Sequence, residues 1–331
     1  MTGVPRPVRR VRRPGRRRWR RALLAALVLA LPAAPGPAAS ETLNGFSLEK
    51  LDVPRALVRA GGPARDQIRS VDAPRFVPAA EAPWMPPDVA VIGLERGGDA
   101  RAFPVHLAER HQVVNDELAG EPVAVVYDPL AGQPTAFLRR VEGRTLRFGV
   151  SGLVYNGAFL LYDRETESLW SAALGRAVAG PLAGRRLERL RVRQETAGAW
   201  VRRHPGTQVL APPEPERLDY RYSPFSAHWV TNEIPFPVAA RDERFHAKEL
   251  VLGVVVEGKA RAYLGSRLTA AGGSVRDDFA GRSVTIRYDG EAGVLTWDAP
   301  ADVLGLESYW YAWKAFHPDT EVWEPKAPAA P

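Results

Sequence analysis

Three stretches of the chain match three later stretches in the same order. The first pair, VIGLERGGDARAF and VLGVVVEGKARAY, lies 160 residues apart. The three pairs are Val91–Phe103 with Val251–Tyr263, Asn115–Asp128 with Arg276–Asp289, and Ala199–Val209 with Ala312–Val322. Because the order is kept while the offsets shrink to 113, one unit occurs twice, with deletions in the second copy. We therefore predict an α+β fold, mostly antiparallel β, in which two diverged repeats form a pseudo-symmetric body.

Short apolar segments separated by turn residues predict hairpins from Val89 onward. Leu153–Asp163 places Asn156-Gly157 between two apolar runs, which is a strong hairpin signal. Helical patterns are fewer. The best two are Glu195–His204 and Leu306–His317, each followed by proline.

These patterns divide the chain into consecutive parts. They are a signal peptide (1–40), an irregular lead-in (41–88), a first repeat unit (89–210) with an extra hairpin block (135–168), a proline-rich connection (211–250), a second, shortened repeat unit (251–324) and a disordered tail (325–331). The hairpin block has almost no counterpart in the second unit. A specialised site is therefore expected in the first unit, near that block.

The first forty residues have the pattern of an export signal. A block of arginines precedes the apolar run Ala22–Leu31, and small residues follow, with a cleavage site expected after Ser40. The run has about half of the ~20 residues that span a bilayer, so no permanent membrane span is predicted. We expect a periplasmic or extracellular protein. The pattern leaves open whether export uses the Sec or the twin-arginine route.

Charge and cysteine content exclude several classes of function. The net charge is +7, but the ten arginines of residues 1–40 account for more than all of it and leave −3 for the remainder. A basic nucleic-acid-binding surface is therefore not expected. The chain has no cysteine, which excludes disulfides and thiol chemistry. No cofactor is predicted.

Several motifs resemble a bacterial family, the domain-of-unknown-function family 3179. They include GGPARDQI, DAPRF, ARAFP, HQVVND, FGVSGLVYN, YDRETESLWS and HPGT, in family order, and the resemblance runs from about Gly61 to Glu324. No established activity comes with it. Members commonly carry Cys-Pro-Leu-Cys-Gly where this chain has Asp128-Pro129-Leu130-Ala131-Gly132. The resemblance thus implies a cysteine site that has been lost here.

The same motifs define a candidate ligand pocket. Its predicted residues are His111, Asn115, Asp116, Asp128, Ser151, Tyr155, Asn156, Trp170 and Ser171. We also expect the tryptophans to be mostly core residues, with Trp229 as the exposed exception.

Two classes of function remain open. The favoured hypothesis is a non-catalytic binding or interaction module with a degenerate cysteine site, whose partner is a small molecule or an envelope protein. The alternative is a metal-dependent enzyme or metal-handling protein that uses His111, Asp116 and Asp128. A serine nucleophile in GVSGL (149–153) is disfavoured, because Leu153 replaces the second glycine of the motif. A carboxylate pair in YDRETES (162–168) is explained more simply as a solvated turn.

Overall fold

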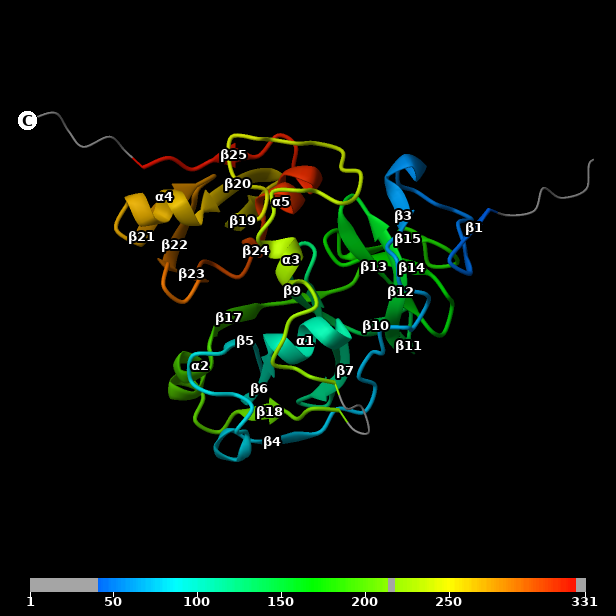
Figure 1. Cartoon of the computed structure of the whole chain (residues 1–331), viewed down its shortest axis with the longest axis horizontal. Helices are drawn as coiled ribbons and strands as arrows, with labels where there is room; N and C mark the ends of the chain where they lie inside the picture. The colour runs from blue at the N-terminus through cyan, green and yellow to red at the C-terminus, as the bar shows by residue number, and fades with distance from the viewer. Residues whose placement is uncertain (1–40, 214–217, 326–331) are drawn as a thin grey trace, which may run out of the picture. The chain divides into compact units, whose positions relative to one another are not determined.

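The regular secondary structure of the protein is mostly β-strand, with a few short helices. The computed structural model describes residues 41–213 and 218–325. The predicted signal peptide and residues 326–331 of the predicted tail lie outside the described residues. Strands account for 43% and helices for 13%, and the sheets are arranged as a five-bladed β-propeller (Figure 1). The predicted α+β class is therefore wrong, because nearly every apolar segment forms a strand.

Five sheets of three to five strands form the blades. The first contains β3 (Val58–Ala60), β12 (Phe148–Tyr155), β13 (Ala158–Asp163), β14 (Leu169–Ser171) and β15 (Arg176–Ala179). The second contains β7 (Val113–Leu118), β8 (Glu121–Asp128), β9 (Gln133–Leu138) and β16 (Arg189–Leu190). The third contains β4 (Phe76–Pro78), β5 (Ala90–Arg96), β6 (Asp99–Pro104), β17 (Val192–Thr196) and β18 (Gln208–Leu210).

The last two large sheets come from the end of the chain. One contains β19 (Leu250–Val256), β20 (Lys259–Leu264), β24 (Leu304–Tyr309) and β25 (Glu321–Val322). The other contains β21 (Ser274–Phe279), β22 (Arg282–Asp289) and β23 (Val294–Asp298). Two short hairpins complete the described strands, namely β1 (Thr42–Leu43) with β2 (Phe46–Ser47), and β10 (Arg140–Val141) with β11 (Arg144–Thr145).

The helices are short. They are α1 (Val105–His111), α2 (Ala197–Arg203), α3 (Ser226–Trp229), α4 (Gly265–Ala270) and α5 (Trp310–Phe316), with single 3₁₀ turns at Arg55–Leu57 and Ala79–Glu81. The helix expected over Leu306–His317 begins later than predicted, at Trp310, because β24 extends through Leu306 to Tyr309. No helix within 41–213 or 218–325 is long and apolar enough to cross a bilayer.

The predicted body of two repeated units is also wrong for the molecule as a whole. Two sheets do share a strand order: β17-β5-β6-β18 in one and β24-β19-β20-β25 in the other, with the last pair parallel in each. The sheet of β3 and β12–β15 has no matching sheet among the C-terminal strands. Five sheets, rather than two equal units, therefore build the body.

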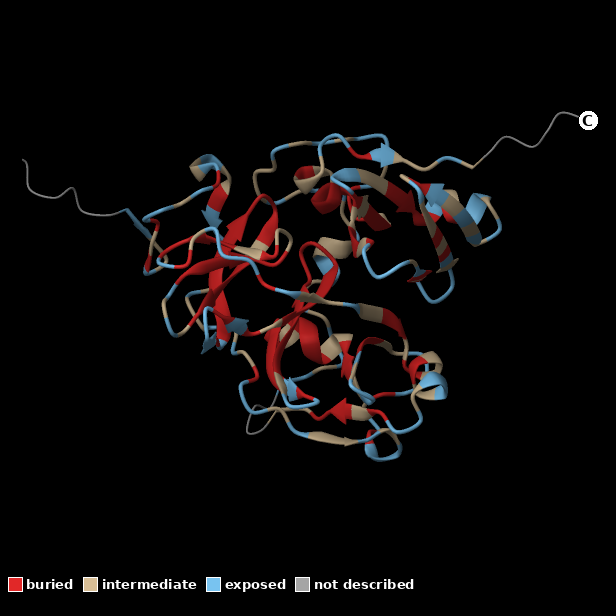
Figure 2. Ribbon diagram, turned by 180° about the vertical axis from the view of Figure 1, so that it is seen from behind, coloured by how far each residue is buried: buried red, intermediate tan, exposed pale blue. Residues whose placement is uncertain are grey.

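Buried side chains are concentrated in the strands (Figure 2). The predicted Asn156-Gly157 hairpin is confirmed: Tyr155 pairs with Ala158, and φ is +54° at Asn156 and +82° at Gly157. The sheets meet along neighbouring strands, because β24 lies against β9 and β17 lies against β23. This convergence of β9, β17, β23 and β24 positions the cavity described below.

Candidate functional site

The predicted pocket residues lie in several separate hydrogen-bonded environments. His111, at the end of α1, is buried, with Nδ1 2.8 Å from the carbonyl oxygen of Arg69 and Nε2 2.8 Å from the hydroxyl of Tyr220. Asp116 is buried on β7, and its Oδ2 lies 3.8 Å from Nε of Arg101. Burial raises the pKa of Asp116.

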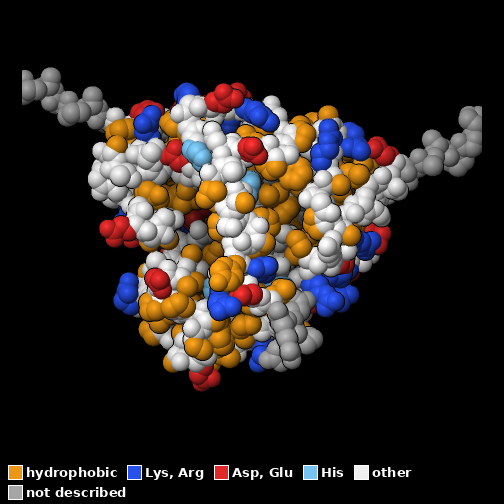
Figure 3. Space-filling view, viewed as in Figure 1, with side chains coloured by type: hydrophobic (Ala, Val, Ile, Leu, Met, Phe, Trp, Pro, Cys, Tyr) orange, Lys and Arg blue, Asp and Glu red, His pale blue; other side chains and the backbone are white. Residues whose placement is uncertain are grey.

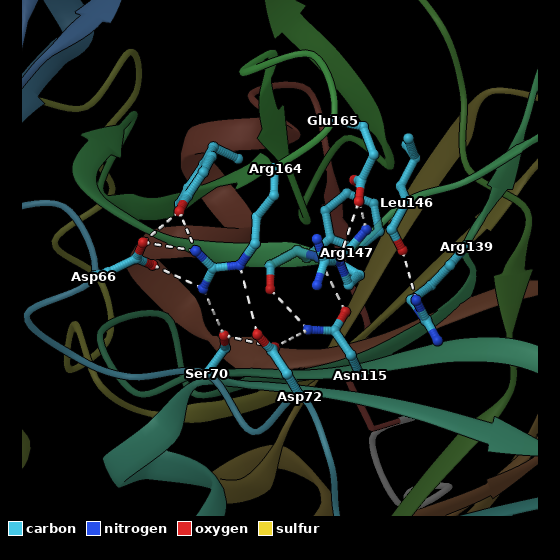
Figure 4. Close-up of polar contacts among 11 residues, drawn as sticks. Asp66, Ser70, Asp72, Asn115, Arg139, Leu146, Arg147, Arg164 and Glu165 are labelled. Atoms are coloured by element: carbon cyan, nitrogen blue, oxygen red, sulfur yellow. Dashed lines mark hydrogen bonds and ion pairs between the residues drawn. The ribbon is translucent and has the colours of Figure 1, made fainter.

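Asn115 lies in a polar network that joins the lead-in to β12 (Figure 4). Its Nδ2 donates to Asp72 at 2.7 Å and to the carbonyl of Phe148 at 2.8 Å, and its Oδ1 accepts from the Phe148 N–H at 2.9 Å. Arg164 continues the network with ion pairs to Asp66 at 2.8 Å and Asp72 at 3.5 Å. Both amide hydrogens of Asn115 are used, so this residue holds structure.

Asp128 closes the four-residue turn between β8 and β9. Its Oδ1 accepts from the N–H groups of Leu130 and Ala131 at 3.0 and 3.1 Å, and its Oδ2 accepts from Phe159 N–H at 2.7 Å. Burial raises its pKa to about 6, although the three N–H donors act in the opposite direction. Asp289 holds the β22–β23 turn in the same way, through Glu291 and Ala292 N–H at 3.0 Å each.

The backbone of the Asp128 turn is covered by later parts of the chain. The carbonyl of Leu130 accepts from Tyr311 Oη at 2.9 Å and lies 3.0 Å from Nε2 of His228. The carbonyl of Ala131 accepts from the Tyr309 N–H at 2.7 Å. Trp229, predicted to be exposed, is half-buried, with Nε1 3.4 Å from the Pro129 carbonyl. Asp128 and Ala131 themselves are buried.

The remaining predicted residues have structural partners within 41–213 and 218–325. The Oγ of Ser151 donates to the Leu160 carbonyl at 2.5 Å, and the Asn156 side chain joins the carbonyl of Ala315 to the N–H of Ala239. Tyr155 packs its ring against Phe316. Trp170 Nε1 donates to Asp163, and Ser171 Oγ accepts from the Leu174 N–H.

The structure places a different group of polar residues around a cavity where β9, β17 and β24 converge. This interblade cavity has a volume of about 210 Å³. Its lining residues include Thr135, Arg189, Leu190, Arg191, Val192, Trp297, Leu306 and Glu307. Thr135 is 3% exposed and Glu307 is 5% exposed. Neither Thr135 Oγ1 nor Glu307 Oε2 has a hydrogen-bond partner among the described residues. Buried polar atoms in this state are rare in native proteins and mark sites that take water, ions or ligands.

Glu307 is the most unusual ionisable group at this cavity. Burial raises its pKa to about 8, and the only opposing contribution is the backbone N–H of Gln194 on β17. The carboxyl group is therefore protonated at neutral pH and can both donate and accept a hydrogen bond. Arg191 lies at the cavity rim, where it packs over Trp297 at 4.3 Å and donates to the Ala299 and Pro300 carbonyls.

A second cavity lies beside the interblade cavity. The lining residues include Tyr127, Gly132, Gln194, Lys248 and Tyr309. Burial raises the pKa of both Tyr127 and Tyr309. Gln194 links the two cavities, because its backbone N–H contacts Glu307 and Gln194 also lines the second cavity. Tyr127, just before Asp128, and Gly132, the last residue of the turn, therefore line a cavity, whereas the Asp128 side chain itself is buried in its hydrogen bonds.

The resemblance of the motifs to a known family is tested by comparing the chain with models of protein families. The model described as a protein of unknown function, DUF3179, matches residues 65–302. The chain belongs to this family. No curated protein and no solved structure gives a match.

In this DUF3179 protein, the three residues of the proposed metal site do not form a metal-binding cluster. His111, Asp116 and Asp128 each have different partners, and the described residues hold no group of three His, Cys, Asp or Glu side chains arranged for a metal ion.

Figure 3 shows acidic and basic side chains interspersed with apolar ones on one face of the molecule.

Sequence reasoning missed Thr135 and Glu307, two buried polar residues that line the cavity of this DUF3179 protein. A signal was present for Glu307, a lone acid between apolar residues in VLGLESYW (303–310). An acid at such a position faces the interior when the segment is a buried strand. The helix predicted over Leu306–His317 includes Glu307 and therefore hides this signal, because the residue is read with the helical and not the strand period.

Proposed function

We propose that this protein is an exported, non-catalytic module that binds a small molecule in the interblade cavity. The observation that carries the proposal is the pair of buried, unpartnered polar groups, Thr135 Oγ1 and Glu307 Oε2, at one cavity. A buried polar group without a partner costs about 1–3 kcal/mol. A ligand that satisfies both groups recovers part of this cost on binding.

The lining supports recognition of a compound with apolar and polar parts. Leu190, Val192 and Leu306 supply apolar wall, while Thr135 and Glu307 supply hydrogen-bonding groups. This combination is typical of small-molecule sites. The buried Asp128 turn is assigned a structural role in this proposal, as the remnant of the family's cysteine position.

A thermal-shift screen of polar small molecules against the purified protein tests the proposal. A ligand present at 100 times its Kd stabilises the native state by about 2.7 kcal/mol and raises the melting temperature by several degrees. The variants Thr135→Val and Glu307→Gln should each reduce that shift. Glu109→Gln is the matched control, because Glu109 is also buried with a pKa raised to about 7 but does not line the cavity.

Two results would contradict binding in the interblade cavity. Hits whose melting shifts are identical in wild type, Thr135→Val and Glu307→Gln would place binding elsewhere. A screen in which no compound shifts the wild-type protein would also count against small-molecule binding.

A further inference from the structure

The hydrogen-bonding groups of the interblade cavity indicate the chemistry of its ligand. Glu307 has no Lys or Arg within ion-pair distance among the described residues, so the carboxyl group is buried without a counter-charge. Thr135 Oγ1 is an acceptor as well as a donor. A ligand that offers N–H donors and a positive charge satisfies both residues and also permits Glu307 to ionise.

The walls set the shape of the rest of the ligand. Leu190, Val192 and Leu306 line the same cavity and contribute apolar surface next to the carboxyl group. A volume of about 210 Å³ accommodates a compound of only a few heavy atoms. A short alkyl chain suits these walls, since its burial gains about 0.8 kcal/mol per methylene.

We propose that the interblade cavity takes a small primary amine, with its ammonium group on Glu307 and Thr135 and its alkyl chain against the apolar walls. This inference rests on the proposed function and specifies the ligand class of the same site. Ionised Glu307 then accepts from the ammonium group in a charge-assisted hydrogen bond, which is about twice as strong as a neutral one.

The groups that surround Glu307 agree with this assignment. Thr135 of β9 lines the same cavity, and Gln194 of β17 offers its backbone N–H to Glu307. Tyr127 of β8 and Tyr309, which is on β24 like Glu307, are the neighbouring ionisable groups with hydroxyls. Two arginines also line the cavity, Arg189, which donates to the Ala172 and Ala173 carbonyls, and Arg191. The Arg191 guanidinium donates to two carbonyl groups and stacks on Trp297. Asp302 lines the same cavity and is ion-paired with Arg282 at 2.7 Å.

Calorimetric titration with three probes of similar size tests the ligand class. The probes are n-butylamine, 1-butanol and butyrate. We expect n-butylamine to bind most tightly, at least tenfold more tightly than either of the others. Glu307→Gln should weaken n-butylamine binding at least tenfold, Thr135→Val should weaken it less, and Glu109→Gln should leave it unchanged.

The pH dependence supplies a second readout. Glu307 loses its proton when the ammonium group binds, whereas an alkyl amine with a pKa near 10.4 keeps its own. Affinity for n-butylamine should therefore rise up to about tenfold per pH unit below pH 8 and level off above it. The same dependence should be absent in Glu307→Gln.

The outcomes separate this inference from the proposed function. Equal or tighter binding of 1-butanol or butyrate, lost in Thr135→Val, would overturn the amine assignment and keep the cavity as a binding site. Binding of n-butylamine that is unaffected by both Thr135→Val and Glu307→Gln would overturn the amine assignment at this cavity. If all probes and all screened compounds are insensitive to both substitutions, the proposed function fails as well.

Discussion

At the scale of the residue, two aspartates that hold similar turns should contribute differently to the stability of the protein. Asp128 and Asp289 both accept two N–H groups of the turn that follows them, but only Asp128 is buried, and it accepts a third from Phe159. The surroundings, rather than the turn itself, therefore determine the contribution of each aspartate to stability.

Asp128→Ala should destabilise the protein by on the order of 3 kcal/mol, because it leaves three N–H groups without their acceptor, in a turn that is buried. Asp289→Ala is the matched control and should cost about 1 kcal/mol or less, since water can replace its carboxylate. Urea unfolding of both variants measures the difference. Equal losses would show that the burial of Asp128 has no energetic effect.

Glu307 should make stability depend on pH. Its pKa is raised from 4.5 in the unfolded chain to about 8 in the folded protein. Because the folded protein holds this proton more tightly than the unfolded chain does, Glu307 stabilises the folded state fully below pH 4.5. This stabilisation falls by up to about 1.4 kcal/mol per pH unit between pH 4.5 and pH 8 and is lost above pH 8. Glu307→Gln stays neutral, so its stability relative to wild type should increase between pH 4.5 and pH 8. Denaturant titrations at several pH values check this, and parallel curves would contradict it.

At the scale of the element, two helices pack on their sheets through the same device. Trp200 of α2 lies against Gly93 of β5, and Trp313 of α5 lies against Gly253 of β19. A Cβ atom at Gly253 would come within 2.2 Å of the Trp313 ring. Each indole N–H is also held by a threonine, at 2.8 Å and 2.9 Å. A side chain at either glycine therefore displaces a helix.

Gly253→Ala should destabilise the protein by about 1–3 kcal/mol, as overpacking of a core does. Gly206→Ala is the control, because no atom lies within 4 Å of a Cβ at that position and its φ carries no strain. That control should be neutral or slightly stabilising. Thermal unfolding with near-ultraviolet circular dichroism measures both effects. A neutral Gly253→Ala variant would show that the Trp313 ring has room to move.

Sequence patterns predicted some elements well and others poorly, for identifiable reasons. The Asn156-Gly157 turn was predictable because its positive φ values require those residue types. Leu306–Tyr309 was assigned to a helix, because aromatic and apolar residues in a short segment fit either period. The cavity was not predictable, since Thr135 and Glu307 are distant in sequence and are brought together only by the packing of β9 on β24.

At the scale of the whole molecule, charge is divided unevenly along the chain. Residues 1–40 carry ten arginines and no acid, while the remainder has a net charge of −3. Removal of the leader would therefore change a basic protein into a weakly acidic one. This change bears on both solubility and non-specific binding to nucleic acid.

Under the proposed export, material isolated from the cell envelope should begin within a few residues of Ser40, because the arginine block, apolar run and small residues before it have the pattern of a cleavable signal. Amino-terminal sequencing or mass spectrometry identifies the first residue. Intact peptides covering Arg9–Leu31 in that material would contradict the prediction.

The hydroxyl of Tyr311 shares its single proton between the carbonyls of Leu130 and Gly157, at 2.9 and 3.0 Å, across 181 and 154 residues of chain. Contacts at such separations form late in folding, because the entropy of closing the intervening chain is lost before the contacts stabilise anything. A nascent chain that ends before Tyr311 lacks the donor for both carbonyls. The sheets that these two hydrogen bonds join therefore cannot be locked together until Tyr311 has been synthesised, so the first sheets must wait for the last part of the described chain.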